Sequence, residues 1–171
     1  MYLKYKTWDD LRFPFTRDKQ GQTSLPDFDF TNLGLLMPQN DATEIVYLIA
    51  QFPHNKAENS VLRPHIHFIQ SESNIPTFKM EYRWYNNGEL VPSGWTTLST
   101  DDGEAAFTYT SGDMLQIISF PTISENGESV SSIMDIKIYR DDNLVTGDVL
   151  TKEFDIHYII DTMGSKTEFQ K

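Results

Sequence analysis

Two histidines, two residues apart, are the side chains of this chain best spaced for chemistry. They lie in the run Pro64-His65-Ile66-His67-Phe68. Residues i and i+2 of a β-strand point to the same face, so both imidazoles could ligate one metal ion. Glu72 follows five residues after His67, and His157 lies on a distant strand-like run. The pattern therefore indicates a candidate metal site made of His65, His67, His157 and Glu72.

The spacing His-x-His-x4-Glu resembles the first half of the cupin metal motif, and cupins are jelly rolls. The cupin pattern also has flanking glycines and a second half with a proline-glycine turn, and this chain has neither around His65 or His157. An alternative interpretation places His65 and His67 on the polar face of a strand, where they hydrogen-bond to carboxylates or lie at a subunit contact. We favour this interpretation and expect no cofactor, while a cupin-like metalloprotein with a structural, intersubunit or catalytic metal stays an alternative.

Other catalytic signatures are missing from the sequence. It has no Gly-x-Ser-x-Gly elbow, no Gly-x-Gly-x-x-Gly loop and no phosphate-binding Gly-Lys-Ser/Thr loop. The chain has no Cys, which excludes disulfides, thiol nucleophiles and Cys-ligated metals. The densest carboxylate cluster, Asp101-Asp102-Gly103-Glu104, is typical of a hairpin turn and lacks the ligand spacing of a calcium loop. We predict that the protein is not an enzyme.

Aromatic residues around one turn raise the alternative of carbohydrate binding. Tyr85 and Trp95 flank the turn at Asn86-Asn87-Gly88 and could stack on sugars. Trp84, in contrast, belongs to an alternating set that is typical of a core face. A receptor-binding or glycan-binding module that uses Tyr85 and Trp95 is therefore a second hypothesis.

The elements that must position these residues are short β-strands. Run 77–86 alternates Phe78, Met80, Tyr82 and Trp84 with polar residues, as in a sheet with one buried and one wet face. Turn residues such as Asn, Asp, Gly and Pro separate the runs. The pattern predicts an all-β fold, a β-sandwich or jelly roll of about eight antiparallel strands. The expected strands are 44–52, 63–70, 77–86, 95–99, 105–109, 113–120, 132–140 and 150–160.

The two ends of the chain differ from the expected sandwich domain, residues 41–161. Residues 1–40 are rich in proline turns and large apolar side chains, which indicates an irregular, extended arm that packs on its own or a neighbouring subunit. One helical turn is possible at Thr7–Leu11. The last expected strand has a core face of Phe154, Ile156, Tyr158 and Ile160, and residues 162–171 form a polar tail that we expect to contact a neighbour.

Length and charge bound the function further. A chain of 171 residues is long enough for one domain with a sizeable core. Its formal net charge of -11 argues against general binding to nucleic acid. The first residues carry charge where a signal peptide would be apolar, and no stretch approaches the roughly 20 apolar residues of a membrane span. We expect no membrane partner and synthesis in the cytoplasm.

Three segments together resemble a family of small tailed-bacteriophage proteins that are regarded as virion structural components. They are Trp8-Asp9-Asp10-Leu11-Arg12-Phe13-Pro14, then Pro53-His54 with Pro64-His65-Ile66-His67, and finally Asp155-Ile156-His157-Tyr158 with Ile160-Asp161-Thr162-Met163-Gly164-Ser165. The resemblance spans residues from about 7 to the end. It implies a β-sandwich subunit of a phage particle, on the head surface, at the neck or in the tail.

From this resemblance we expect a head decoration or auxiliary capsid protein, located in the virion and made in the host bacterial cytoplasm. Its partners would be other copies, in a homo-oligomer such as a trimer, and the major capsid, portal, neck or tail proteins. The residues expected at subunit interfaces are Trp8, Arg12, Phe13, Phe15, Met163 and Phe169.

Overall fold

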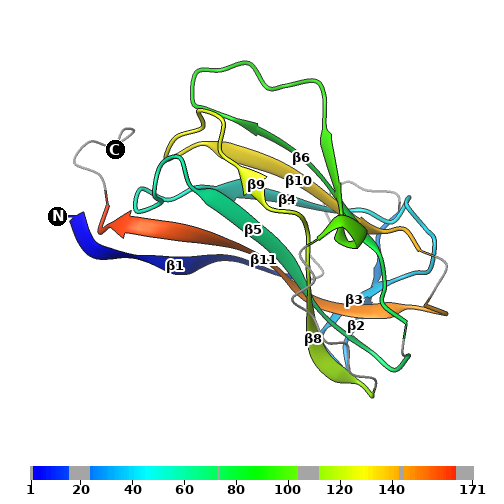
Figure 1. The fold of residues 1–171 in the computed structure, drawn as a ribbon. Helices are drawn as coiled ribbons and strands as arrows, with labels where there is room; N and C mark the ends of the chain where they lie inside the picture. The colour runs from blue at the N-terminus through cyan, green and yellow to red at the C-terminus, as the bar shows by residue number, and fades with distance from the viewer. Residues whose placement is uncertain (1, 16–23, 73, 104–111, 143–144, 165–171) are drawn as a thin grey trace.

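The computed structural model describes residues 2–15, 24–72, 74–103, 112–142 and 145–164, and the structural statements below concern these residues. They form a two-layered β-sandwich with no α-helix in the described ranges (Figure 1). The predicted all-β sandwich is therefore confirmed. None of the described residues belongs to a helix long and apolar enough to cross a membrane.

The first sheet has the strand order β2-β3-β11-β5-β8, with β1 also pairing with β11 and β9 with β5. All its pairings are antiparallel. The strands are β1 (Tyr2–Pro14), β2 (Asp27–Asp29), β3 (Gly34–Met37), β5 (Val61–Gln70), β8 (Met114–Ser119), β9 (Ile123–Ser124) and β11 (Val149–Thr162).

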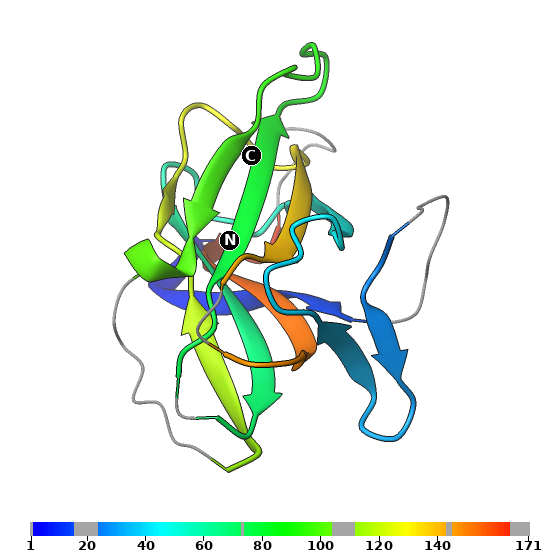
Figure 2. The same ribbon diagram turned by 90° about the vertical axis from the view of Figure 1, so that its right-hand side faces the viewer.

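The second sheet has the order β4-β10-β6-β7 and is also antiparallel. Its strands are β4 (Val46–Gln51), β6 (Phe78–Tyr85), β7 (Thr96–Ser99) and β10 (Ile133–Arg140), and one 3-10 turn, η1 (Thr100–Asp102), follows β7. The segment between β6 and β7 extends away from the body of the sandwich (Figures 1 and 2).

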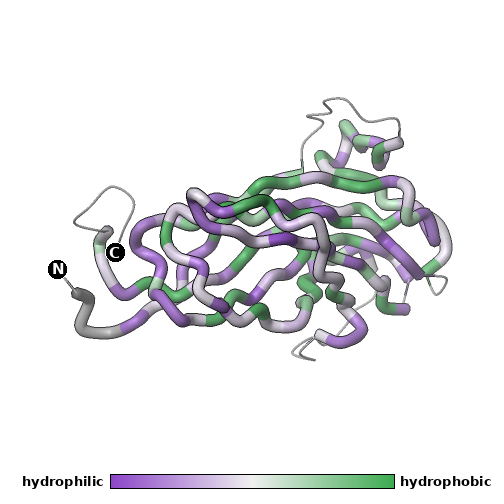
Figure 3. Tube along the Cα trace, turned by 90° about the horizontal axis from the view of Figure 1, so that it is seen from above, coloured by the Kyte–Doolittle hydropathy of each residue, from purple (hydrophilic) through white to green (hydrophobic). Residues whose placement is uncertain are grey.

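The core lies between the two sheets and is built by period-2 alternation. On β6, Phe78, Met80 and Trp84 are buried, and on β11, Phe154 and Ile156 are buried. Colouring by hydropathy shows apolar and polar positions alternating along the strands (Figure 3). Both predicted core faces are confirmed, with Tyr158 buried and Tyr82 and Ile160 packed partly buried against the core.

Seven of the eight expected strands coincide with observed strands to within two residues at each end. The eighth, 105–109, lies outside the described residues. The turn chemistry at their borders was therefore a reliable signal in this chain.

The described residues among the first forty are more regular than the sequence predicts. The expected helical turn at Thr7–Leu11 is wrong, because these residues belong to β1, which pairs with β11 from Thr7↔Ile160 to Pro14↔Glu153. β3 pairs with only the first residues of β11, and β1 pairs with the rest of the same edge. The backbone hydrogen bonds of this pairing stabilise a strand more than the Thr7 cap would stabilise a helical turn. Residues Asp27–Asp29 and Gly34–Met37 add a hairpin to the same sheet.

Candidate functional site

The candidate site lies on the outer face of the first sheet, where β1, β11, β5 and β8 run side by side. The strand register places Asp155 beside His65 on one side and Arg12 on the other. It likewise places His157 between Asp10 and Arg63. Cross-strand partners share a face, so a band of histidine, carboxylate and guanidinium groups crosses the sheet.

Three of these side chains converge on one point. The Nε2 atoms of His65 and His67 are 3.2 Å apart. Asp155 Oδ2 lies 3.5 Å from His65 Nε2 and 3.2 Å from His67 Nε2. His65 and Asp155 are each only 4% exposed although they point to an outer face, and His67 is partly exposed. We call these three residues the His-His-Asp cluster.

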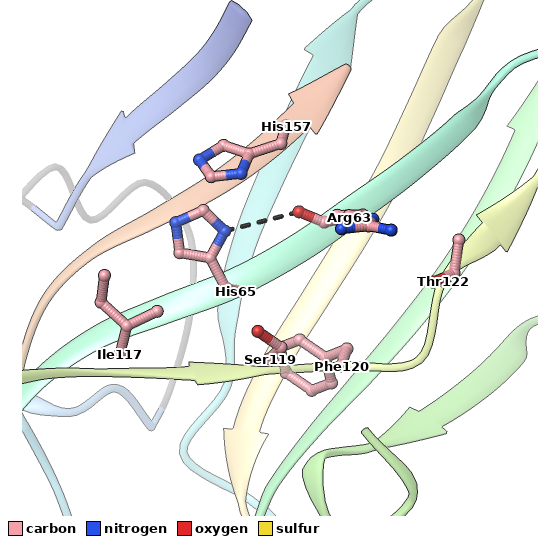
Figure 4. A pocket seen from close by; sticks show the side chains of 7 residues that line it. All are labelled: Arg63, His65, Ile117, Ser119, Phe120, Thr122 and His157. Atoms are coloured by element: carbon pink, nitrogen blue, oxygen red, sulfur yellow. Dashed lines mark hydrogen bonds between the residues drawn. The ribbon is translucent and has the colours of Figure 1, made fainter. Parts of the chain in front are cut away.

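The hydrogen bond of the second ring nitrogen of His65 determines which nitrogen carries the proton. His65 Nδ1 lies 3.4 Å from the carbonyl oxygen of Arg63, drawn as a dashed line in Figure 4. Because a carbonyl only accepts, Nδ1 carries the proton and Nε2 of the neutral ring offers a lone pair to the cluster. Burial, with the nearby charge of His157 second, lowers the pKa of His65 to about 4. The ring is therefore neutral near pH 7.

Asp155 is strained electrostatically by its surroundings. Burial, and then the neighbouring carboxylate of Glu153, raise the pKa of Asp155. Its Oδ1 atom is buried and has no hydrogen-bond partner among the described residues. A buried carboxylate oxygen without a donor is costly, so the cluster is short of positive charge or of donors.

His157 stands next to the cluster without joining it. Its Nε2 lies 3.0 Å from Asp10 Oδ1, and its ring meets the ring of His65 edge-on, with centroids 4.3 Å apart. On its other side, the guanidinium of Arg63 lies 5.0 Å from the centre of the Trp8 ring. His157 therefore links the cluster to the edge strand β1.

A recess of about 150 Å³ opens beside His65. Figure 4 shows the rings of His65 and His157 on one side of it and Ser119 and Phe120 on the other. Its lining mixes polar and apolar groups, namely Arg63, His65, Ile117, Ser119, Phe120, Thr122 and His157.

Exposed apolar side chains flank the polar band at both ends. On β8, Leu115 is 60% and Ile117 43% exposed, and on β1, Trp8 is 47% exposed. Ile117 is the cross-strand partner of His67, and Trp8 is that of Ile159. We call Trp8, Leu115 and Ile117 the outer-face patch.

The sequence-predicted metal ligands are only partly brought together. His65 and His67 share one point, and His157 is their neighbour, whereas Glu72 does not belong to the group. Glu72 follows the end of β5, and its Oε2 accepts from the backbone N–H of Thr146 at 3.1 Å. Asp155 takes the carboxylate position instead, because the register sets it directly beside His65.

The residues expected at interfaces lie in different environments. Trp8 and Arg12 are exposed, and Arg12 donates to Glu153 Oε2 at 2.6 Å. Met163 is exposed at the end of β11, and Phe169 lies outside the described residues. Phe15 is buried in this chain's own core, and the Phe13 ring packs on Phe154 with centroids 5.9 Å apart. These two phenylalanines therefore stabilise the subunit itself.

The two aromatics of the carbohydrate hypothesis contact different side chains. Arg83 and Lys137 stand over the Trp95 ring, at 4.7 and 3.8 Å from its centre. Tyr85 donates to Asp135, with oxygen–oxygen distances of 3.3 Å. Tyr85 also lines a recess of about 520 Å³ with the turn at residues 86–89, and Trp95 is not part of that lining.

Comparisons with known proteins identify no family. No protein-family model matches the chain, and no curated protein matches it. Among solved structures, "Structure of Eiger TNF from S. frugiperda" aligns with a TM-score of 0.29 and 8% identity, over 80% of this chain and 96% of that chain. At this TM-score the likeness supports no conclusion about function or assembly.

Proposed function

We propose that this protein is a structural subunit of a tailed-bacteriophage particle, which binds other copies of itself through the outer face of the first sheet. The phage assignment is supported by the sequence resemblance in the segments around Trp8, His65 and His157. The assembly role is supported by the outer-face patch.

The outer-face patch is the observation that carries the assembly role. Trp8, Leu115 and Ile117 leave large apolar surfaces uncovered on a regular, extended sheet face. Large apolar side chains that stay exposed on a subunit surface mark many protein–protein interaction sites, and here they lie on either side of the polar band. Arg63 and Trp8, stacked on one another, are also residue types that dominate interface energies.

The position of β1 agrees with this role. It forms an outer strand on β11, and its exposed side chains Trp8, Asp10 and Arg12 lie on the same face as the cluster. Arg12 and Asp10 there offer charges of both signs, so a symmetric contact could pair them across copies. As an auxiliary head protein the subunit would stabilise the capsid through many such repeated contacts.

Two experiments test the proposal in turn. Light scattering of the purified protein over a range of concentrations should give a mass of two or more whole chain masses, as for a trimer, and the mass of one chain throughout would refute self-association. Immunogold labelling of the phage that encodes it should mark many sites over the capsid. A label confined to the neck or tail would remove the head-decoration role, and absence of the protein from purified particles would refute the virion role altogether.

A second candidate function, glycan or receptor binding, is supported by the recess beside Tyr85. It is lined by amide and carboxylate groups of the turn at residues 86–89 together with an aromatic ring, a combination that suits sugar hydroxyls and faces. Substituting Tyr85→Ala should then abolish host adsorption and leave particles intact. Normal adsorption by particles carrying this variant would exclude the recess as a receptor site.

A further inference from the structure

We propose that His65 Nε2, His67 Nε2 and Asp155 Oδ2 bind one divalent transition-metal ion, with Zn²⁺ as the ion that fits them best. This inference does not depend on the assembly role. It rests on the triangle of ligand atoms, on the direction of their lone pairs and on the unpartnered oxygen of Asp155.

The triangle has the dimensions of one face of a zinc tetrahedron. Its sides measure 3.2, 3.5 and 3.2 Å. Tetrahedral Zn²⁺ with bonds of about 2.0–2.1 Å holds its ligand atoms about 3.3–3.4 Å apart. An ion at about 2.05 Å from all three atoms would lie about 0.7 Å above their plane, as the centre of a regular tetrahedron lies above each face.

The proton positions leave acceptors pointing at the same place. His65 uses Nδ1–H on the Arg63 carbonyl, so Nε2 presents a lone pair. Such a hydrogen bond from the second ring nitrogen to a carbonyl is the usual outer-shell support of a metal-binding histidine. Asp155 adds an acceptor oxygen, and two acceptors face each other unfavourably unless a cation or a proton lies between them.

The unpartnered oxygen of Asp155 is a separate indication. Oδ1 is buried without a hydrogen-bond partner among the described residues. A carboxylate that binds a cation through Oδ2, or through both oxygens, regains the stabilisation that burial takes away.

The ligand set selects the class of ion. Two imidazoles and one carboxylate suit Zn²⁺ and its first-row neighbours, whereas Ca²⁺ and Mg²⁺ require oxygen ligands. His67 is the exposed member, with 20% of its side chain accessible, so the fourth position opens on its side. Water would fill that position in the isolated chain, as in zinc sites with three protein ligands.

The site would join two neighbouring strands. His65 and His67 lie on β5 and Asp155 on β11, so one ion would crosslink the pair at the centre of the first sheet. Any ligand that binds only the folded chain raises its unfolding temperature. Zinc should therefore stabilise the protein as well as bind to it.

The test uses the full chain, stripped of metal by a chelator and then dialysed against micromolar free zinc. We expect one zinc per chain by elemental analysis, a zinc-dependent rise in unfolding temperature, and visible bands of tetrahedral Co²⁺ after cobalt substitution. His67→Ala and the isosteric Asp155→Asn should each lower zinc occupancy at least tenfold. His54→Gln is the matched control, since His54 pairs with Ser131 away from the cluster and should keep full occupancy.

Each outcome decides the proposal. Circular dichroism of the chelated variants checks that they are folded, and His67→Ala is the safer of the two because His67 is partly exposed. Less than stoichiometric zinc in the wild-type chain overturns the site. So does a folded His67→Ala variant that retains zinc, or a His54→Gln variant that loses it. None of these results bears on whether copies associate.

Discussion

Replacing Leu115 and Ile117 together by serine should weaken self-association without unfolding the subunit. These β8 side chains are 60% and 43% exposed in the single chain. Full burial of such a side chain is worth about 1.5–3 kcal/mol, so burying the exposed share of each gains about 1 kcal/mol. Where two copies each contribute both residues, the contact loses about 4 kcal/mol, or roughly a thousandfold in the dissociation constant.

The assay is sedimentation velocity on the wild type and the double variant over a concentration series. The matched control is Tyr47→Ser with Ile49→Ser, because these side chains are 51% and 68% exposed on β4 of the other sheet. The control should associate like the wild type. Unchanged association of the Leu115/Ile117 variant, or equal weakening by the control, would refute the assignment of the contact to this face. Both variants should unfold within about 0.5–1 kcal/mol of the wild type, since exposed substitutions cost little.

Three further predictions concern stability. Glu125→Gln should cost about 3–5 kcal/mol in urea unfolding, because it removes the carboxylate that pairs with the buried Lys56 ammonium at 2.6 Å. Adding Lys56→Met should restore most of the loss, and simple additivity of the two substitutions would contradict this. Burial raises the pKa of Tyr158 to about 12, so its contribution to stability, present below the unfolded value near 10, should fall by about 3 kcal/mol as pH rises through that window. Tyr158→Phe should reduce the loss of stability above pH 10 by that amount, and an unchanged loss would contradict the assignment. In metal-free protein, the double substitution His65→Val with Asp155→Val should raise the free energy of unfolding in urea by about 1–4 kcal/mol. If the cluster only stabilises the fold, the same substitution should lower the free energy of unfolding.

The strands of the sandwich could be predicted from the sequence because the patterns that indicate them are local. Alternation on β6 and β11 and the turn residues between runs predict both the strands and their buried faces. β1 was not readable in this way. It is a strand because it pairs with the open edge of β11, more than a hundred residues away in sequence. The large apolar residues Leu11 and Phe13 indicated only that the segment packs against other parts of the protein.

Only part of the site could be predicted from the sequence, for the same reason. Spacing alone predicts that His65 and His67 share a face, and alternation places Asp155 and His157 on the outward face of β11. Which carboxylate meets the histidines depends on register, and a slip of one residue would turn Asp155 into the core. Glu72 was the nearer residue in sequence, but β5 ends before it.

The His-His-Asp cluster should destabilise the metal-free fold, and this argues that its role is to bind a metal ion. The outer face of a sheet can carry valine or threonine at no penalty, whereas this chain buries a carboxylate to 4% exposure, with one oxygen unpartnered among the described residues, beside the neutral imidazole of His65. Burial of an incompletely satisfied charge opposes folding, and a well-packed apolar pair at the same positions removes that opposition. His65 and Asp155 are cross-strand partners, so two β-branched side chains would pack directly against one another there. If the apolar pair stabilises the metal-free protein while abolishing zinc binding, the cluster is a binding site maintained against the stability of the fold. If it destabilises the protein instead, the three polar groups belong to the architecture, and the metal has no part in explaining them.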